Sequence, residues 1–105
     1  EATNAVTLPT VPGAPTIGSA SAGNGQATAS WTAPAADGGS PVTGYVVTPY
    51  IGHYPLPSQT FASTATTQVV TGLTNGTQYR FRVQAINALG TGGFSKVTNP
   101  VIPSA

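Results

Sequence analysis

Cysteine and methionine are absent from this chain, and charged residues make up only 5% of it, against about 25% in an average globular domain. The absence of cysteine excludes disulfide bonds and thiol chemistry. Because a domain of 105 residues can be stable without disulfides, this absence does not show whether the protein works inside or outside the cell. Solubility must come instead from threonine, serine, asparagine, glutamine and glycine. This composition is typical of a bacterial extracellular module.

The charge balance argues against two classes of partner. Three Lys and Arg residues against two Asp and Glu residues give a formal net charge of +1, which offers no electrostatic basis for binding nucleic acid or an anionic membrane. No apolar run approaches the roughly 20 residues that span a bilayer, and no segment has the pattern of a signal peptide. We therefore expect no nucleic-acid partner and no membrane-embedded segment.

The sequence has few residues that could perform catalysis or bind a metal. Glu1 and Asp37 are the two acidic residues, and His53 is the one histidine. Acid–base catalysis needs paired carboxylates a few ångströms apart, and a zinc or calcium site needs several ligands close together. The glycine-rich residues 90–93 superficially resemble a phosphate-binding loop, but no helical pattern follows them. We expect no enzyme, no cofactor and no metal.

Residues 73–85 contain the clearest structural signal of the chain. Alternation places Tyr79, Phe81, Val83 and Ala85 on one face of a strand and polar residues on the other, as a half-buried strand requires. The preceding Leu-x-x-Gly-x-x-Tyr pattern, which begins at Leu73, indicates a tyrosine corner, in which a tyrosine hydroxyl bonds a nearby backbone group. This feature favours an antiparallel β-sandwich.

Further short β-patterns recur between turn signals. They predict strands over residues 16–20, 26–31, 43–50, 59–61, 66–71 and 96–102, a tight turn at residues 23–25, and loops over 33–41 and 87–95. Residues 51–58 read as irregular, and Pro49 should end the third strand or force a bulge. The predicted core consists of Trp31, Tyr45, Val47, Val70, Leu73, Tyr79, Phe81, Val83 and Ala85. The fold class that follows is all-β, a seven-stranded antiparallel immunoglobulin-like sandwich.

The proline-rich start of the chain divides it into two parts. Residues 1–11 contain no convincing element and read as a linker, and residues 12–105 form the domain. Because edge strands that carry proline resist pairing with other chains, we expect a monomer.

In this order the motifs resemble those of a fibronectin type III domain, over about residues 11–102. They are Pro12, Pro15, Trp31, Tyr45, Val46, Val47, Leu73, Gly76, Thr77, Tyr79, Phe81, Val83, Ala85 and the loop Asn-Ala-Leu-Gly-Thr-Gly-Gly-Phe-Ser at 87–95. The chain departs from the family at Asn75, where proline is usual, and at Pro49, where a hydrophobic strand residue is usual.

The resemblance implies a function as well as a fold. The amino-acid sequences of the loops at 33–45 and 88–92 are similar to those of modules from secreted bacterial, especially actinobacterial, proteins. Such domains lie between the catalytic and carbohydrate-binding domains of polysaccharide-degrading enzymes, or in arrays on cell-surface proteins. The resemblance thus implies a secreted or cell-surface, non-catalytic spacer whose partners are the neighbouring domains of its parent protein, with chain ends at opposite poles.

Three surface regions leave alternatives open. Tyr50, His53 and Tyr54 are candidate ligand-binding residues, since exposed aromatic rings stack on sugars, but the two tyrosines could instead cover the sheet edge and pack on prolines. Exposure of these rings would support a weak polysaccharide-binding module. Arg80 and Arg82 could contact an anion, or could simply cover the sheet with their stems. The loops 33–41 and 87–95 could bind a surface protein through an apolar patch around Leu89 and Phe94.

Overall fold

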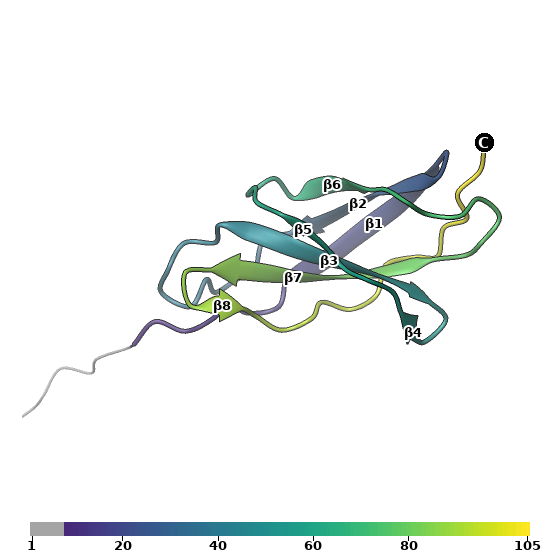
Figure 1. Ribbon diagram of the computed structural model, residues 1–105. Helices are drawn as coiled ribbons and strands as arrows, with labels where there is room; N and C mark the ends of the chain where they lie inside the picture. The colour runs from purple at the N-terminus through teal and green to yellow at the C-terminus, as the bar shows by residue number, and fades with distance from the viewer. Residues whose placement is uncertain (1–7) are drawn as a thin grey trace, which may run out of the picture.

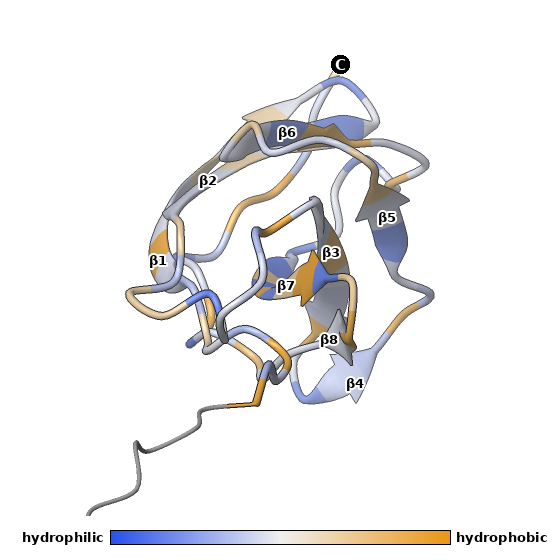
Figure 2. Cartoon of the chain, turned by 90° about the vertical axis from the view of Figure 1, so that its left-hand side faces the viewer, coloured by the Kyte–Doolittle hydropathy of each residue, from blue (hydrophilic) through white to orange (hydrophobic). Residues whose placement is uncertain are grey.

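The structure is a computed structural model that describes residues 8–105, and this part of the chain forms a two-layered β-sandwich (Figure 1). One sheet has the order β1-β2-β6, and the other has the order β4-β3-β7-β8, with β5 also paired to β3. Figure 2 shows the first sheet arched over the second. The strands are β1 (Thr16–Gly23), β2 (Gln26–Thr32), β3 (Gly44–Ile51), β4 (Tyr54–Pro55), β5 (Gln59–Phe61), β6 (Thr67–Val70), β7 (Arg80–Asn87) and β8 (Gly90–Thr91). The predicted all-β antiparallel sandwich is confirmed.

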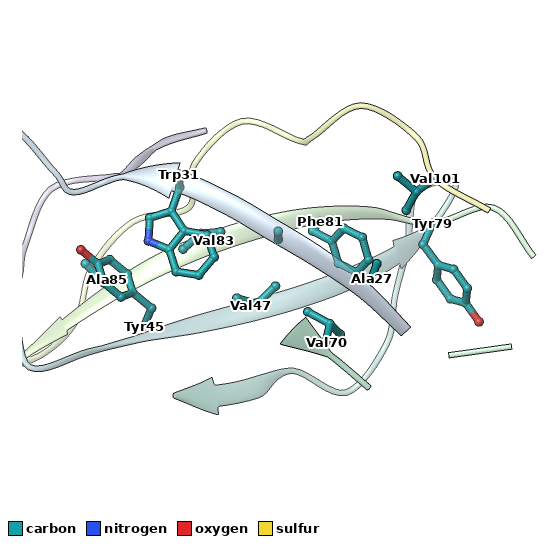
Figure 3. Close-up of a cluster of buried hydrophobic side chains, with 11 residues drawn as sticks. Ala27, Trp31, Tyr45, Val47, Val70, Tyr79, Phe81, Val83, Ala85 and Val101 are labelled. Atoms are coloured by element: carbon teal, nitrogen blue, oxygen red, sulfur yellow. The ribbon is translucent and has the colours of Figure 1, made fainter. Parts of the chain in front are cut away.

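The core fills the space between the two sheets and is made of side chains at alternate strand positions (Figure 3). The rings of Trp31 on β2 and Tyr45 on β3 meet edge to face, with centroids 5.1 Å apart. Such a pair adds about 0.5–1.5 kcal/mol to the burial of its area. Leu73 is partly buried and packs against the core, whereas the other predicted core residues are at most 5% exposed.

The corner before β7 has the geometry that the sequence predicts. The hydroxyl of Tyr79 accepts a hydrogen bond of 2.8 Å from the backbone N–H of Thr74. The backbone N–H of Leu73 in turn donates to the carbonyl of Gly25 in the β1–β2 turn. In that turn Gly25 alone takes a positive φ, of 64°, and Asn24 does not. The corner therefore ties the start of β7 to the end of the other sheet.

Pro49 does not end the third strand, and on the β7 side the prediction of a break was wrong. Pro49 pairs with Phe81 and Tyr50 pairs with Arg80, without a shift of register. The carbonyl of Pro49 points to the opposite edge of β3, where it accepts from the N–H of Leu56. A backbone N–H at this position would point the same way, so the β7 ladder loses no donor. On that opposite edge the partner of β3 changes from β5 to β4, and residues 51–58 are thus not wholly irregular.

The predicted last strand, over residues 96–102, is not a regular strand, and its correction has a structural reason. Hydroxyl oxygens take the place of backbone carbonyls: Ser95 Oγ accepts from the N–H of Val83, and Thr98 Oγ1 accepts from the N–H of Phe81. Val101 then forms an isolated bridge with Tyr79. Partners recur every third residue here but every second residue on β7, so a continuous ladder cannot form.

The chain enters and leaves the sandwich at opposite poles (Figure 1). At the entry, Thr10 donates its N–H to the carbonyl of Gly38 and accepts from the side-chain amide of Asn87 at the end of β7. At the exit, Ser104 donates to Gly23, and Pro103 accepts from Gly76 near the tyrosine corner. The predicted linker, residues 1–11, lies outside the described residues up to position 7.

Candidate functional site

The outward face of β3 and β7 carries an aromatic and cationic cluster. The odd-numbered residues 45–49 of β3 and 81–85 of β7 point into the core, so Tyr50, Arg80 and Arg82 point outward. The register places Tyr50 opposite Arg80 and Thr48 opposite Arg82. Phe94, which follows β8, lies over the same face. We call Tyr50, Arg82 and Phe94 the outer-face stack.

Arg82 is the centre of this stack. Its guanidinium carbon lies 5.4 Å from the ring centroid of Tyr50 and 6.0 Å from that of Phe94. Cation–π contacts of this kind hold a guanidinium in place while leaving its in-plane N–H groups free. The Nε atom of Arg82 is buried without a hydrogen-bond partner among the described residues. The arrangement therefore fixes the direction in which the remaining N–H groups point.

Positive charge gathers on one side of the domain. Arg80 lies two residues before Arg82 on the same face and is exposed. Arg80 also lines a hollow of about 240 Å³ with His53, Gly52 and Gln78. The hollow combines a permanent cation with an imidazole and an amide, all of which can hydrogen-bond to a polar ligand.

The candidate residues Tyr50, His53 and Tyr54 do not form one platform. Tyr50 is partly buried against Arg82, whereas Tyr54 is 71% exposed and His53 lies exposed in the β3–β4 turn. Tyr54 pairs with Ile51, and Tyr50 pairs with Pro55. Because cross-strand partners share a face and neighbours along a strand do not, the two tyrosines point to opposite faces of the β3–β4 hairpin.

The loop residues Leu89 and Phe94 are both about half exposed, at 50% and 48%. Phe94 also borders a groove of about 500 Å³, which Ala14, Pro15, Ile17 and Lys96 line as well. The sequence pattern predicts Phe94 to be a loop residue and gives no sign of its contact with Arg82. Only the alternation of β7, which places Arg82 outward, pointed toward this face.

The core contains a tyrosine whose titration is perturbed by burial. Burial raises the pKa of the Tyr45 phenol above its ordinary value of 10.0, and the adjacent indole of Trp31 opposes part of that rise. The Nε1 of Trp31 has no hydrogen-bond partner of acceptable geometry among the described residues. Tyr45 is 1% exposed, so its phenol is held neutral as part of the core.

Two further observations concern residues 8–105. No group of three or more histidine, cysteine, aspartate or glutamate side chains in this range could hold a metal ion. The same residues include no helix long and apolar enough to cross a membrane.

The antiparallel two-sheet architecture, the tyrosine corner and the buried tryptophan define an immunoglobulin-like β-sandwich. The family model of the fibronectin type III domain matches residues 12–101, and the chain belongs to this family. Fibronectin type III domains are generally non-catalytic modules that lie beside other domains in multidomain proteins.

Solved structures of titin and twitchin resemble the chain in both fold and sequence. Domains A168–A170 of titin match with a TM-score of 0.78 and 29% identity over 90% of this chain and 33% of theirs. The twitchin kinase region of C. elegans matches with a TM-score of 0.72 and 31% identity, over 90% of this chain and 17% of that one. Titin kinase with its flanking domains gives 0.71 and 28%, with the same two coverages. The chain thus spans a third or less of each.

Proposed function

We propose that this domain is a rigid, non-catalytic spacer of a secreted or cell-surface multidomain protein. The observation that carries the proposal is that the chain enters and leaves the sandwich at opposite poles (Figure 1). A folded domain with this geometry separates its neighbours by its own length. The matched structures of titin and twitchin are likewise made of several domains in one chain.

The entry to the domain is bonded in a way that suits a spacer. Asn87 is 4% exposed and donates both amide protons, to the carbonyl of Thr10 at 2.7 Å and to that of Asp37 at 2.9 Å. A few residues after Thr10, the backbone N–H of Gly13 donates to the carbonyl of Ala36. A side chain cannot be added at Gly92, where a Cβ would lie 2.0 Å from the carbonyl oxygen of Pro12. The entering segment is therefore packed from Thr10 onward.

The exit is bonded less extensively but at the opposite end. Backbone hydrogen bonds of 2.8 Å and 3.1 Å join Pro103 to Gly76 and Ser104 to Gly23. These bonds extend the ordered chain to within one residue of its end in this sequence. Both attachment points are thus fixed to the same rigid body.

A distance measurement tests the spacer function. The domain is fused between two fluorescent proteins, and the distribution of their separation is measured by energy transfer, beside a Gly-Ser linker of equal length. A flexible linker samples a broad distribution around roughly 5–6 Å × √n. We expect a narrower distribution for the domain, broadened by Asn87→Ala. A distribution as broad as that of the Gly-Ser linker would contradict the proposal.

The secreted bacterial setting, with a polysaccharide-degrading parent enzyme, is part of the same proposal. Its support is the low content of charged residues, the absence of cysteine, and the wording of the loops at 33–45 and 88–92. Secretion can be tested by expressing the domain with an export signal in a bacterial host. Folded, soluble protein should accumulate outside the cell, whereas degradation there would count against this setting.

A second candidate function is weak binding of a neutral polysaccharide, favoured by the 71% exposure of Tyr54. Depletion of the domain from solution by insoluble chitin or cellulose measures it directly. Tyr54→Ala should abolish retention if this ring stacks on sugar, and Tyr50→Ala should matter less because its ring packs on Arg82. Absence of retention for the unaltered domain would exclude chitin and cellulose as ligands and would leave the spacer function unaffected.

A third candidate, binding of a surface protein through the loops 33–41 and 87–95, rests on the exposure of Leu89 and Phe94. Replacement of either loop by Gly and Ser residues should then remove the partner from a pull-down.

A further inference from the structure

We propose that the outer face of β3 and β7 binds a carboxylated polysaccharide, with Arg82 and Arg80 as the residues that contact its carboxylates. This inference does not depend on the spacer function, since a spacer can carry a binding face. It is also separate from the neutral-sugar candidate, which relies on Tyr54.

The Arg82 guanidinium is held by two aromatic rings and lacks a hydrogen-bond partner at Nε among the described residues. The ring centroids of Tyr50 and Phe94 each lie within 6.0 Å of the guanidinium carbon, so the guanidinium packs against two aromatic rings. The Arg82 side chain makes no hydrogen bond to another residue in the described part of the chain, and its Nε is buried and unpartnered. The N–H groups at the partly exposed tip are held in one plane. A carboxylate is the group that pairs most closely with such a planar fork.

Among residues 8–105, no acidic residue lies close to the two arginines. Asp37 is the only acidic residue within the described range 8–105, and its backbone carbonyl bonds Asn87. Asn87 lies five residues beyond Arg82 on β7, which corresponds to about 17 Å along the strand. At that distance, beyond the Debye length of about 8 Å, an exposed carboxylate contributes little. The two arginines, about 7 Å apart along the strand, therefore present unneutralised charge on one face.

The pairing of β7 argues against an extended peptide as the ligand of this face. Both edges of β7 are already paired, one with β3 and the other with β8 and the hydroxyls of Ser95 and Thr98. An extended peptide therefore cannot add to β7 as a strand, which is a common mode of peptide binding on sheets. A ligand must lie across the side chains of the face instead.

The side chains next to the two arginines offer both apolar area and hydrogen-bonding groups to a sugar. Phe94 is 48% exposed and offers apolar area beside Arg82, where the C–H face of a sugar ring can pack. Next to Arg80 the hollow with His53 and Gln78 offers hydrogen-bonding groups for hydroxyls. Carboxylate, ring face and hydroxyls occur together in a polymer of uronic acids.

Affinity electrophoresis tests the proposal. The isolated domain is run in gels that contain polygalacturonate, neutral dextran, dextran sulfate or poly-glutamate. We expect retardation by polygalacturonate and none by dextran. Arg82→Gln and Arg80→Gln should each weaken the apparent affinity about tenfold, as expected for the loss of one charge-assisted contact. Lys96→Gln removes the same charge from the groove on the other side of Phe94, where no contact with the carboxylates is proposed, and should change the affinity less than about twofold.

Several results would overturn the proposal. One is an equal loss for the Lys96 and Arg82 variants, because net charge alone would then explain the binding. Retardation by dextran sulfate or poly-glutamate as strong as that by polygalacturonate would remove the carboxylated sugar as the preferred ligand. Retardation by dextran that Arg82→Gln leaves unchanged would point to a neutral-sugar site.

A second variant keeps the test decisive if Arg82→Gln does not fold. Phe94→Ala leaves both arginines in place but removes one ring from the stack and the apolar surface beside it. We expect it to lower the affinity about threefold or more. A folded Phe94→Ala domain that binds polygalacturonate as tightly as the unaltered one would contradict the role given to the stack.

Discussion

The two faces of β7 are organised by different rules. Inward-facing Phe81, Val83 and Ala85 are fully buried, and their order follows from a two-residue period in the sequence. Outward-facing Arg82 is positioned by Tyr50, on the neighbouring strand, and by Phe94, from a loop after β8. The inward face stabilises the domain, and we infer that the outward face supplies its chemistry. Substitutions on the two faces should therefore differ in what they change.

The largest effect is expected from the inward side. Trp31→Ala should lower the free energy of unfolding by about 3–5 kcal/mol, because removal of the ring leaves a cavity and ends its contact with Tyr45. Small domains have about 5–15 kcal/mol in total, so the variant should be close to unfolding. Urea denaturation followed by circular dichroism measures it. A loss below about 1 kcal/mol would mean that the ring is not a main support of the core.

Thr98→Val tests the edge where hydroxyls replace a strand. The change keeps the shape of the side chain but removes the acceptor of the buried N–H of Phe81, a bond of 3.1 Å. An unsatisfied buried donor costs about 1–3 kcal/mol. Thr91→Val, on the exposed β8, serves as the matched control and should lie within about 0.5 kcal/mol of the unaltered domain in urea denaturation. Equal effects at the two positions would show that the hydroxyl of Thr98 is not needed.

The pH dependence of stability reports on the buried phenol of Tyr45. Its pKa is raised in the folded state, so the folded domain holds this proton more tightly than the unfolded chain. The corresponding stability is present below pH 10, and it is lost as the pH rises from there through the folded-state pKa. We expect the free energy of unfolding to fall more steeply above pH 10 for the unaltered domain than for Tyr45→Phe. Parallel curves would contradict this.

The smallest effect on stability is expected on the outward side. Phe94→Ala removes one exposed contact with Arg82, which is about 0.5–1 kcal/mol. Thermal unfolding at several salt concentrations can resolve it. If Phe94→Ala destabilised the domain as much as Thr98→Val, the outer-face stack would count as a structural element like the core.

The parts of the fold that could be predicted from the sequence depend on local patterns. The alternation after Tyr79 and the Leu73 corner both involve residues within a few positions of each other, and the structure has both. Pro49 illustrates the limit of such rules. Its effect depends on which edge of β3 its missing N–H would face, and that is set by pairing with β4, β5 and β7.

The candidate site was predicted less well, since it depends on residues brought together by the fold. Tyr50 and Tyr54 are close in sequence, and both are aromatic, but the hairpin turns them to opposite faces. Arg82 and Phe94 are twelve positions apart, with β8 and a loop between them. The three-residue spacing of Ser95, Thr98 and Val101 likewise becomes meaningful only beside the two-residue spacing of β7.

The most direct test of the division between the two faces is a pair of measurements on one variant, Arg82→Met. Methionine keeps much of the apolar stem and its contact with the rings, but it lacks the guanidinium. We predict a change in the free energy of unfolding below about 1 kcal/mol, together with loss of retardation by polygalacturonate. A larger loss of stability with unchanged retardation would contradict the account, because Arg82 would then belong to the structural support of the domain.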